Sequence, residues 1–170
     1  MTRLAALASA AAVVAGAGLV LSVLVHLSAV AGGPNPLGRA AWLLHGGIFV
    51  VWLPAVLCAQ RLTRDARRSD FWRVALRGCP PWMRYMAYAF FAYAMLNFVL
   101  FITGAFGDRD DEIVSVRGFS GHWMVFYSVA LVLLYSYAHT DTRTRRCAAG
   151  HAVSPTASYC ETCGRLVTPP

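Results

Sequence analysis

Four long apolar stretches divide this chain, and each has about the length of a membrane span. They cover residues 4–31, 40–60, 82–106 and 119–139. A helix needs about 20 apolar residues to cross a hydrocarbon core of about 30 Å, and every stretch meets that length. No Asp, Glu or Lys lies inside them, and their only Arg is Arg84, near the start of the third. A soluble amphipathic helix would carry a charged stripe, so the pattern predicts an all-α membrane protein built on a four-transmembrane-helix bundle.

The polar segments give the domain organisation. We expect residues 1–140 to form the four-helix transmembrane domain and residues 141–170 to form a separate tail. Between the second and third spans, residues 69–78 begin with a serine that can cap a helix and continue with mixed apolar and basic positions. A proline pair follows them at 80–81. This pattern predicts a short amphipathic helix that lies in the lipid headgroup layer. The alternative for this segment is a docking site for a protein partner.

The positive charge indicates the orientation in the membrane. All 15 basic residues are Arg, and the formal net charge is +7. Two connections hold most of them, namely Arg61, Arg64, Arg67, Arg68, Arg73 and Arg77 before the third span and Arg143, Arg145 and Arg146 after the fourth. Basic connections stay in the cytoplasm, so we expect an integral protein of the bacterial inner (plasma) membrane with both termini cytoplasmic. The charge suits a bilayer with anionic headgroups. Nucleic acid is not an expected partner, because no basic helix with base-reading residues accompanies the charge.

The tail carries metal-ligand side chains in two pairs. Cys147 and His151 form the first pair, and Cys160 and Cys163 form the second. A tetrahedral zinc site needs two such pairs on facing turns, and the tail itself is too short to build an apolar core. The spacing therefore predicts a structural Zn²⁺ ion bound by these four residues, without which the tail would not fold.

This segment, from Cys147 to Arg165, resembles the short zinc-ribbon tails found on many bacterial membrane proteins. In that pattern two ligand-bearing knuckles flank a short segment with small and aromatic residues. The commoner form has four cysteines, whereas here Gly150 stands where the second Cys would be and His151 takes its place. The resemblance implies a closed structural zinc site, with Tyr159 packed across the knuckles. It covers none of the membrane domain.

Three histidines lie at similar depths in three different spans. His26, His45 and His122 are each four to seven residues from a polar connection on the predicted outer side, which places them within about 10 Å of that boundary. Neutral imidazoles can ligate haem iron or a transition metal, and polar residues inside spans often mark function. The alternative is that each histidine bonds to a neighbouring carbonyl or reaches the headgroups.

The favoured function is non-catalytic, because no nucleophile elbow, phosphate-binding glycine loop or pair of intramembrane carboxylates is present. We expect a small membrane subunit or adaptor that docks a cytoplasmic protein partner through its ribbon or basic connection. The alternative is a redox or metal-handling membrane protein that holds haem or a transition metal at the three histidines. The small residues Ala8, Ala12 and Gly16 could also support homo-oligomer formation.

Overall fold

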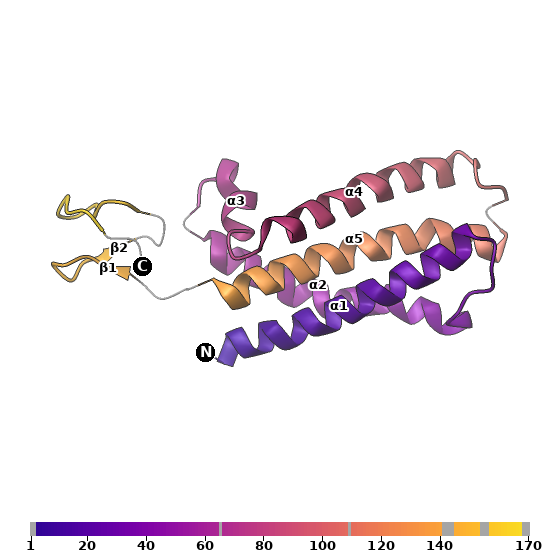
Figure 1. Ribbon diagram of the computed structural model, residues 1–170, viewed down its shortest axis with the longest axis horizontal. Coiled ribbons are helices and arrows are strands. Elements are labelled where there is room, and N and C mark those ends of the chain that lie inside the picture. Colours follow the sequence, from indigo (N-terminus) through magenta and orange to yellow (C-terminus); the bar gives the residue numbers. More distant parts are fainter. Residues whose placement is uncertain (1–2, 65, 109, 141–144, 154–156, 168–170) are drawn as a thin grey trace. The chain divides into compact units, whose positions relative to one another are not determined.

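The computed structural model describes residues 3–64, 66–108, 110–140, 145–153 and 157–167. The chain divides into two compact units, Met1–His139 and Thr140–Pro170 (Figure 1). The first unit contains four long helices: α1 (Arg3–Val30), α2 (Trp42–Thr63), α4 (Pro81–Ile102) and α5 (Glu112–His139). All four are long and apolar enough to cross a membrane, counting the short 3₁₀ turn Gly38–Ala41 with α2. The predicted all-α architecture with four such helices is confirmed.

Helix α5 is the central helix of the bundle. It packs against α1, α2 and α4, and it is the most buried of the four helices although it is the least hydrophobic. Figure 1 shows it between α1 and α4, with α2 behind. Its buried positions include three serines, Ser120, Ser128 and Ser136, each fully inaccessible to solvent. Each serine has a hydrogen-bond partner: another element for Ser120 and Ser136, and the backbone of α5 itself for Ser128.

Helix α1 meets α5 along a stripe of mostly small residues. The stripe repeats at alternating intervals of four and three residues: Ala8, Ala12, Ala15, Leu19, Ser22, His26 and Ala29. This spacing keeps one side of the helix facing its partner, as in left-handed helix pairs. A Cβ atom placed on Gly16 would lie 4.0 Å from Leu131 of α5. The small-residue face that suggested oligomer formation is therefore used within one chain.

Two glycines make room for one aromatic ring at the centre of the bundle. The ring of Tyr127 in α5 occupies the space where Gly18 of α1 would carry a Cβ atom, and its hydroxyl occupies the corresponding space at Gly47 of α2. That hydroxyl donates a hydrogen bond to the carbonyl of Leu44 over 2.9 Å. Tyr127 of α5 therefore contacts both α1 and α2, and three helices meet at its ring. Any side chain at Gly18 would push the ring toward α2.

Helix α5 begins seven residues before the apolar stretch that predicted it. The reason is local: one carboxylate oxygen of Asp111 accepts hydrogen bonds from the backbone N–H groups of Ile113, over 2.7 Å, and Val114, over 3.2 Å. Such a cap satisfies free donors in the first turn and starts a helix among polar residues. A search for apolar runs misses this start because Glu112, Ser115 and Arg117 interrupt the apolar positions of the first turns.

The connection between α2 and α4 contains less helix than predicted. A 3₁₀ turn, Arg68–Asp70, leads into the short helix α3, Phe71–Ala75. Ala75, Leu76 and Cys79 are buried against the bundle, whereas Trp72 is exposed. The segment thus packs on the helices through Phe71 and its second half and presents Trp72 outward.

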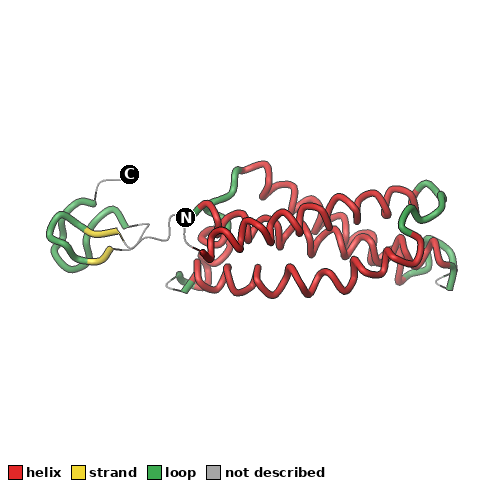
Figure 2. The backbone as a smooth tube through the Cα atoms, turned by 90° about the horizontal axis from the view of Figure 1, so that it is seen from below, coloured by secondary structure: helices red, strands yellow, loops and turns green. Residues whose placement is uncertain are grey.

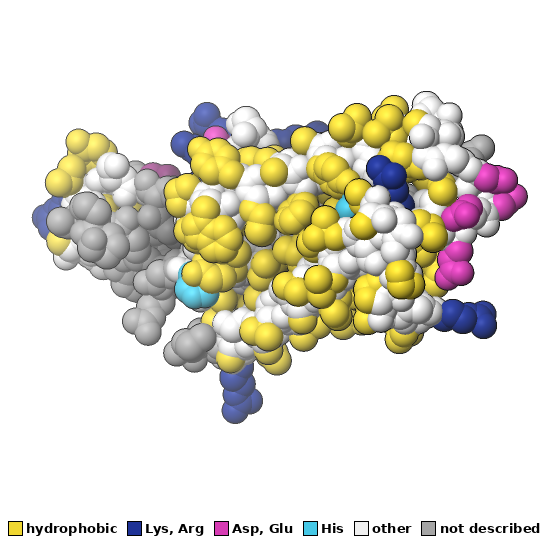
Figure 3. Space-filling view, turned by 45° about the vertical axis from the view of Figure 1, so that its right-hand side comes forward, with side chains coloured by type: hydrophobic (Ala, Val, Ile, Leu, Met, Phe, Trp, Pro, Cys, Tyr) yellow, Lys and Arg dark blue, Asp and Glu magenta, His cyan; other side chains and the backbone are white. Residues whose placement is uncertain are grey.

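The outside of the bundle is largely apolar. Exposed Leu, Val, Phe and Tyr side chains lie along α1, α2 and α4. Figure 3 shows one apolar face of the bundle in yellow. Acidic side chains, drawn in magenta, gather at the end that carries the connection between α4 and α5. An apolar belt of this kind suits the hydrocarbon core of a membrane.

Candidate metal centre and the histidines of the bundle

Two similar hydrogen-bonded turns, the second one residue longer than the first, hold the four predicted ligands. In the first, the N–H of Cys147 donates to the carbonyl of His151 over 3.0 Å, and the N–H of Gly150 donates to the carbonyl of Cys147 over 2.8 Å. In the second, Cys160 bonds in the same way to Arg165, and Gly164 to Cys160, both over 2.8 Å. Gly150 and Gly164 have φ values of 83° and 67°, which L side chains rarely adopt. Glycine is therefore required to close each turn.

Short strands flank both turns. Strands β1 (Arg145–Arg146) and β2 (Ala152–Val153) pair antiparallel on either side of the first turn, and Figure 2 shows them in yellow. A single antiparallel bridge between Tyr159 and Leu166 flanks the second turn. The tail is therefore built from two hairpins, each with a ligand pair at its tip.

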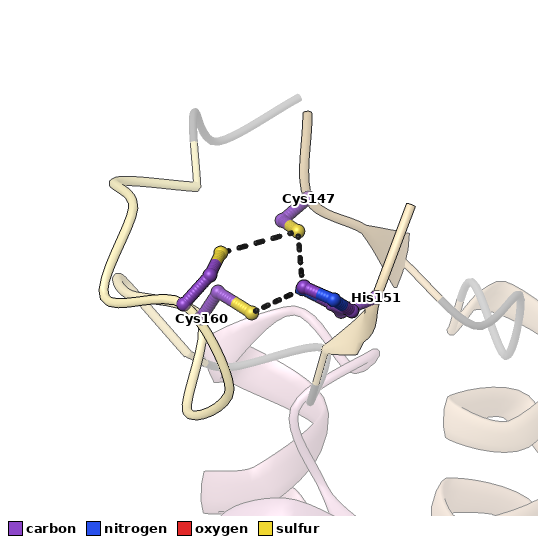
Figure 4. Close-up of side chains that lie close together, drawn as sticks. Cys147, His151 and Cys160 are labelled. Atoms are coloured by element: carbon purple, nitrogen blue, oxygen red, sulfur yellow. Dashed lines mark hydrogen bonds between the residues drawn. The ribbon is translucent and has the colours of Figure 1, made fainter. Parts of the chain in front are cut away.

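The four ligand atoms converge on one point. The Sγ atom of Cys147 lies 3.6 Å from Nδ1 of His151 and 3.7 Å from Sγ of Cys163. The Sγ atom of Cys160 lies 3.8 Å from the same Nδ1 atom. All four atoms lie within 4.8 Å of one another. Figure 4 shows Cys147, His151 and Cys160 pointing toward each other. Among the residues that the structure describes, this is the one group of three or more metal-ligand side chains close enough to share an ion.

These separations match the edges of a tetrahedron around one metal ion. Metal–sulfur bonds of about 2.3 Å and a metal–nitrogen bond of about 2.0–2.1 Å, at tetrahedral angles, give edges of about 3.8 Å between sulfurs. The same geometry gives about 3.6 Å between sulfur and nitrogen. The observed distances of 3.6 to 3.8 Å agree with both values. Three of the six ligand separations thus already have tetrahedral lengths, and the Cys₃His group is compatible with one bound metal ion.

The second turn also favours the thiolate form of Cys160. Burial of the Cys160 thiol raises its pKa. Hydrogen bonds from the backbone N–H groups of Cys163 and Thr162 and from the neighbouring thiols have a larger, opposite effect, so the pKa falls to about 6. Metals bind the thiolate and not the thiol, so a lowered pKa favours binding at neutral pH. All five cysteines of the chain are free of disulfide bonds.

Apart from the ligands, the tail has almost no core. Its buried cluster consists of Cys147, Val153, Cys160 and Val167, so half of the buried residues are ligands themselves. A cluster of this size cannot offset the conformational entropy that is lost when about 30 residues fold. An ion bound by the four ligands would supply the stabilisation that this small cluster cannot.

One expectation for the tail is wrong. Tyr159 does not pack across the two turns, since 61% of its surface is exposed. Its cross-strand neighbour Leu166 is 64% exposed. The second hairpin thus presents an aromatic and an aliphatic side chain together on its surface.

In the bundle, His26 is a link in a chain of hydrogen bonds. Its Nε2 atom lies 2.6 Å from the hydroxyl of Tyr93 in α4, and its Nδ1 atom lies 2.7 Å from the hydroxyl of Ser120 in α5. The hydroxyl of Ser120 lies 3.2 Å from the carbonyl oxygen of Arg117. Every bond is satisfied when Tyr93 donates to Nε2, Nδ1 donates to Ser120, and Ser120 donates to the carbonyl. Both ring nitrogens are then engaged, and His26 joins three helices.

The other two histidines have separate partners. The indole N–H of Trp123 donates to Nδ1 of His45 over 3.1 Å, which leaves the ring proton on Nε2. The Nδ1–H group of His122 donates to the carbonyl of Gly118 over 3.2 Å. His26, His45 and His122 therefore do not form a ligand group within the described residues. The haem or transition-metal site stays a prediction, and each histidine has a structural role without it.

The sequence interpretation overlooked Tyr93 and Ser120. A signal was present, since a buried histidine inside a span needs hydrogen-bond partners from neighbouring helices. Choosing those partners requires the rotation of each helix about its axis, which apolar runs do not reveal.

Comparisons of this chain with protein-family models, with curated proteins and with solved structures find no match. The functional argument therefore rests on the geometry of the chain itself.

Proposed function

We propose that this protein is a small integral membrane subunit or adaptor whose C-terminal unit is a structural zinc ribbon that docks a cytoplasmic protein partner. The observation that carries the proposal is the convergence of Cys147, His151, Cys160 and Cys163 within 4.8 Å. Four protein ligands complete a tetrahedral shell and leave no position for a substrate. Such a site holds a fold together and does not carry out a reaction.

The choice of zinc rests on the ligand set. Three sulfurs and one imidazole nitrogen in tetrahedral arrangement suit zinc, which binds as a single ion and requires no redox partner. Distances of 3.6 to 3.8 Å between ligand atoms fit one ion and are too short to surround a cluster of several metals. In the reducing cytoplasm the thiolates would stay available as ligands.

The docking role rests on the exposed pair formed by Tyr159 and Leu166. Large apolar side chains on a small polar unit serve as anchors in protein interfaces, where tyrosine is enriched. The zinc site positions this pair, because Tyr159 directly precedes the ligand Cys160 and Leu166 follows the closing turn. The cytoplasmic location of the tail is supported by the arginine-rich connections and forms part of the proposal.

Metal content tests the zinc site. The full-length protein is purified in detergent, its visible spectrum is recorded, and metals per chain are counted in the wild type and in a Cys160→Ala/Cys163→Ala variant. We expect one zinc per chain and no visible band in the wild type, and no zinc in the variant. A Soret band, or metal that persists in the variant and is lost on changing His45 or His122, would favour the redox alternative.

Site-specific crosslinking tests the docking surface. A photoreactive amino acid is placed at Tyr159 and, as a matched exposed control in the same turn, at Glu161. We expect one discrete protein adduct from position 159 that is lost in the Cys160→Ala/Cys163→Ala variant and is absent from position 161. Equal adducts from both positions, or adducts that survive loss of the ligands, would contradict a zinc-dependent docking surface.

A further inference from the structure

One end of the bundle is strongly basic. It carries the end of α2, the helix α3 and the start of α4, with seven arginines: Arg61, Arg64, Arg67, Arg68, Arg73, Arg77 and Arg84. Within the described residues one of them has an acidic partner, the exposed pair of Arg73 with Asp70 at 3.0 Å. The positive charge at this end is therefore mostly uncompensated by the described protein residues.

The turn between α3 and α4 is fixed on α5. The N–H of Gly78 donates to the hydroxyl of Ser136 over 3.1 Å, and the thiol of Cys79 donates to the carbonyl of Val132 over 2.9 Å. Burial raises the pKa of the Cys79 thiol, which keeps it protonated as a donor. Arginines on this turn are thus presented by a rigid backbone.

The side chain of Arg84 lies against this turn and reaches the backbone of Arg77. One terminal nitrogen of Arg84 donates to the carbonyl of Cys79 over 2.9 Å and approaches the carbonyl of Arg77 at 3.4 Å. Both side chains are half-buried, and the Nε atom of each is buried without a hydrogen-bond partner in the described chain. Among the described residues neither side chain has a carboxylate partner, and a half-buried guanidinium with unused donors is costly unless an anion binds there.

The side chains around this pair place it at the membrane surface. Trp82 and Tyr85, on either side of Arg84 in the sequence, are 64% and 70% exposed, and Trp72 of α3 is 55% exposed. Tryptophan and tyrosine gather where hydrocarbon meets headgroups. The anion closest to an arginine pair at that depth is the phosphate of a lipid.

We propose that Arg77 and Arg84 form the centre of a binding site for the phosphodiester group of an anionic phospholipid. The planar guanidinium matches a phosphate oxygen pair, and the exposed arginines of α2 and α3 attract the lipid's net negative charge. The apolar surface of α4 receives the acyl chains. The site is independent of the zinc ribbon.

The test uses the full-length protein in lipid nanodiscs that contain equal amounts of phosphatidylglycerol and phosphatidylcholine. Native mass spectrometry counts the lipids that stay bound to wild type, Arg77→Gln, Arg77→Lys and Arg39→Gln. Arg39 is an exposed arginine at the opposite end of the bundle and serves as the control. We expect wild type and Arg39→Gln to retain phosphatidylglycerol preferentially, Arg77→Gln to bind it about tenfold more weakly, and Arg77→Lys to lose less.

Three results would overturn the proposal. The first is a wild type that retains both lipids equally, which needs no variant and so holds even if Arg77→Gln does not fold. The second is an Arg77→Gln variant with wild-type helical content that retains phosphatidylglycerol fully. The third is displacement of the lipid by millimolar inorganic phosphate, which would identify a soluble anion as the ligand.

Discussion

The bundle and the tail of this protein are held together by different means. The bundle buries a continuous core in which α5 is enclosed by α1, α2 and α4, and its glycines let aromatic rings fill the remaining space. Among its described residues the tail buries four, and two of them are candidate metal ligands. Packing and hydrogen bonds between helices hold the first unit together, whereas the second, on the proposed function, depends on a bound ion. Loss of a ligand should therefore unfold the tail, and changes in packing should destabilise the bundle.

The largest effect is expected from removing a single ligand in the tail. Cys160→Ala should unfold the whole C-terminal unit, because metal binding supplies about 10 kcal/mol or more to such small units. The amide protons of Gly150 and Gly164, which are hydrogen-bonded in the two turns, should lose their protection from exchange. Helical content should not change. Thr162→Ala, in the same turn, is the control, and protection that persists in Cys160→Ala would contradict the comparison.

A smaller effect is expected in the bundle when a glycine gains a methyl group. Gly18→Ala should reduce the free energy of unfolding by about 1–3 kcal/mol, because the added Cβ atom overlaps the ring of Tyr127. Gly46→Ala is the matched control, since no atom lies within 4 Å of the Cβ position there. Denaturant unfolding in detergent, followed by circular dichroism, measures both. Equal stability of the two variants would show that Gly18 and the ring of Tyr127 are not tightly packed against each other.

Breaking the hydrogen-bond chain at His26 should cost less. Tyr93→Phe removes the hydroxyl that lies 2.6 Å from His26, and hydrogen bonds between helices in membranes contribute about 0.6 kcal/mol on average. Tyr88→Phe, which alters an exposed tyrosine on the same helix, should have no effect. The same unfolding experiment compares the two. If Tyr88→Phe lost as much stability as Tyr93→Phe, the effect would not come from the hydrogen bonds of His26.

The smallest effect is expected at the exposed ion pair. Asp70→Asn removes the partner of Arg73, and surface pairs contribute about 0–1 kcal/mol. We expect a change in the free energy of unfolding below about 0.5 kcal/mol, reduced further at high salt. A loss above 1 kcal/mol would show that the short helix α3 contributes to the bundle through charge and not through its buried residues.

The sequence alone predicts the four helices and the ligand set for physical reasons. Membrane spans need uninterrupted apolar length, and metal ligands need particular side chains at short spacing, so both can be recognised along one dimension. The start of α5 at Glu112 depends on the cap formed by Asp111, which lies among polar residues. The partners of His26 and the exposure of Tyr159 depend on how elements rotate and pack, and neither leaves a pattern in the sequence.

X-ray absorption spectroscopy at the zinc edge of the purified full-length protein is the sharpest test of the proposed Cys₃His zinc site. We expect one zinc with three sulfur ligands at about 2.3 Å and one nitrogen ligand at about 2.0–2.1 Å. We also expect the sulfur shell to be lost in the Cys160→Ala/Cys163→Ala variant. A wild-type spectrum without sulfur ligands, or a protein that folds its tail with no metal bound, would show that the tail is not a zinc ribbon.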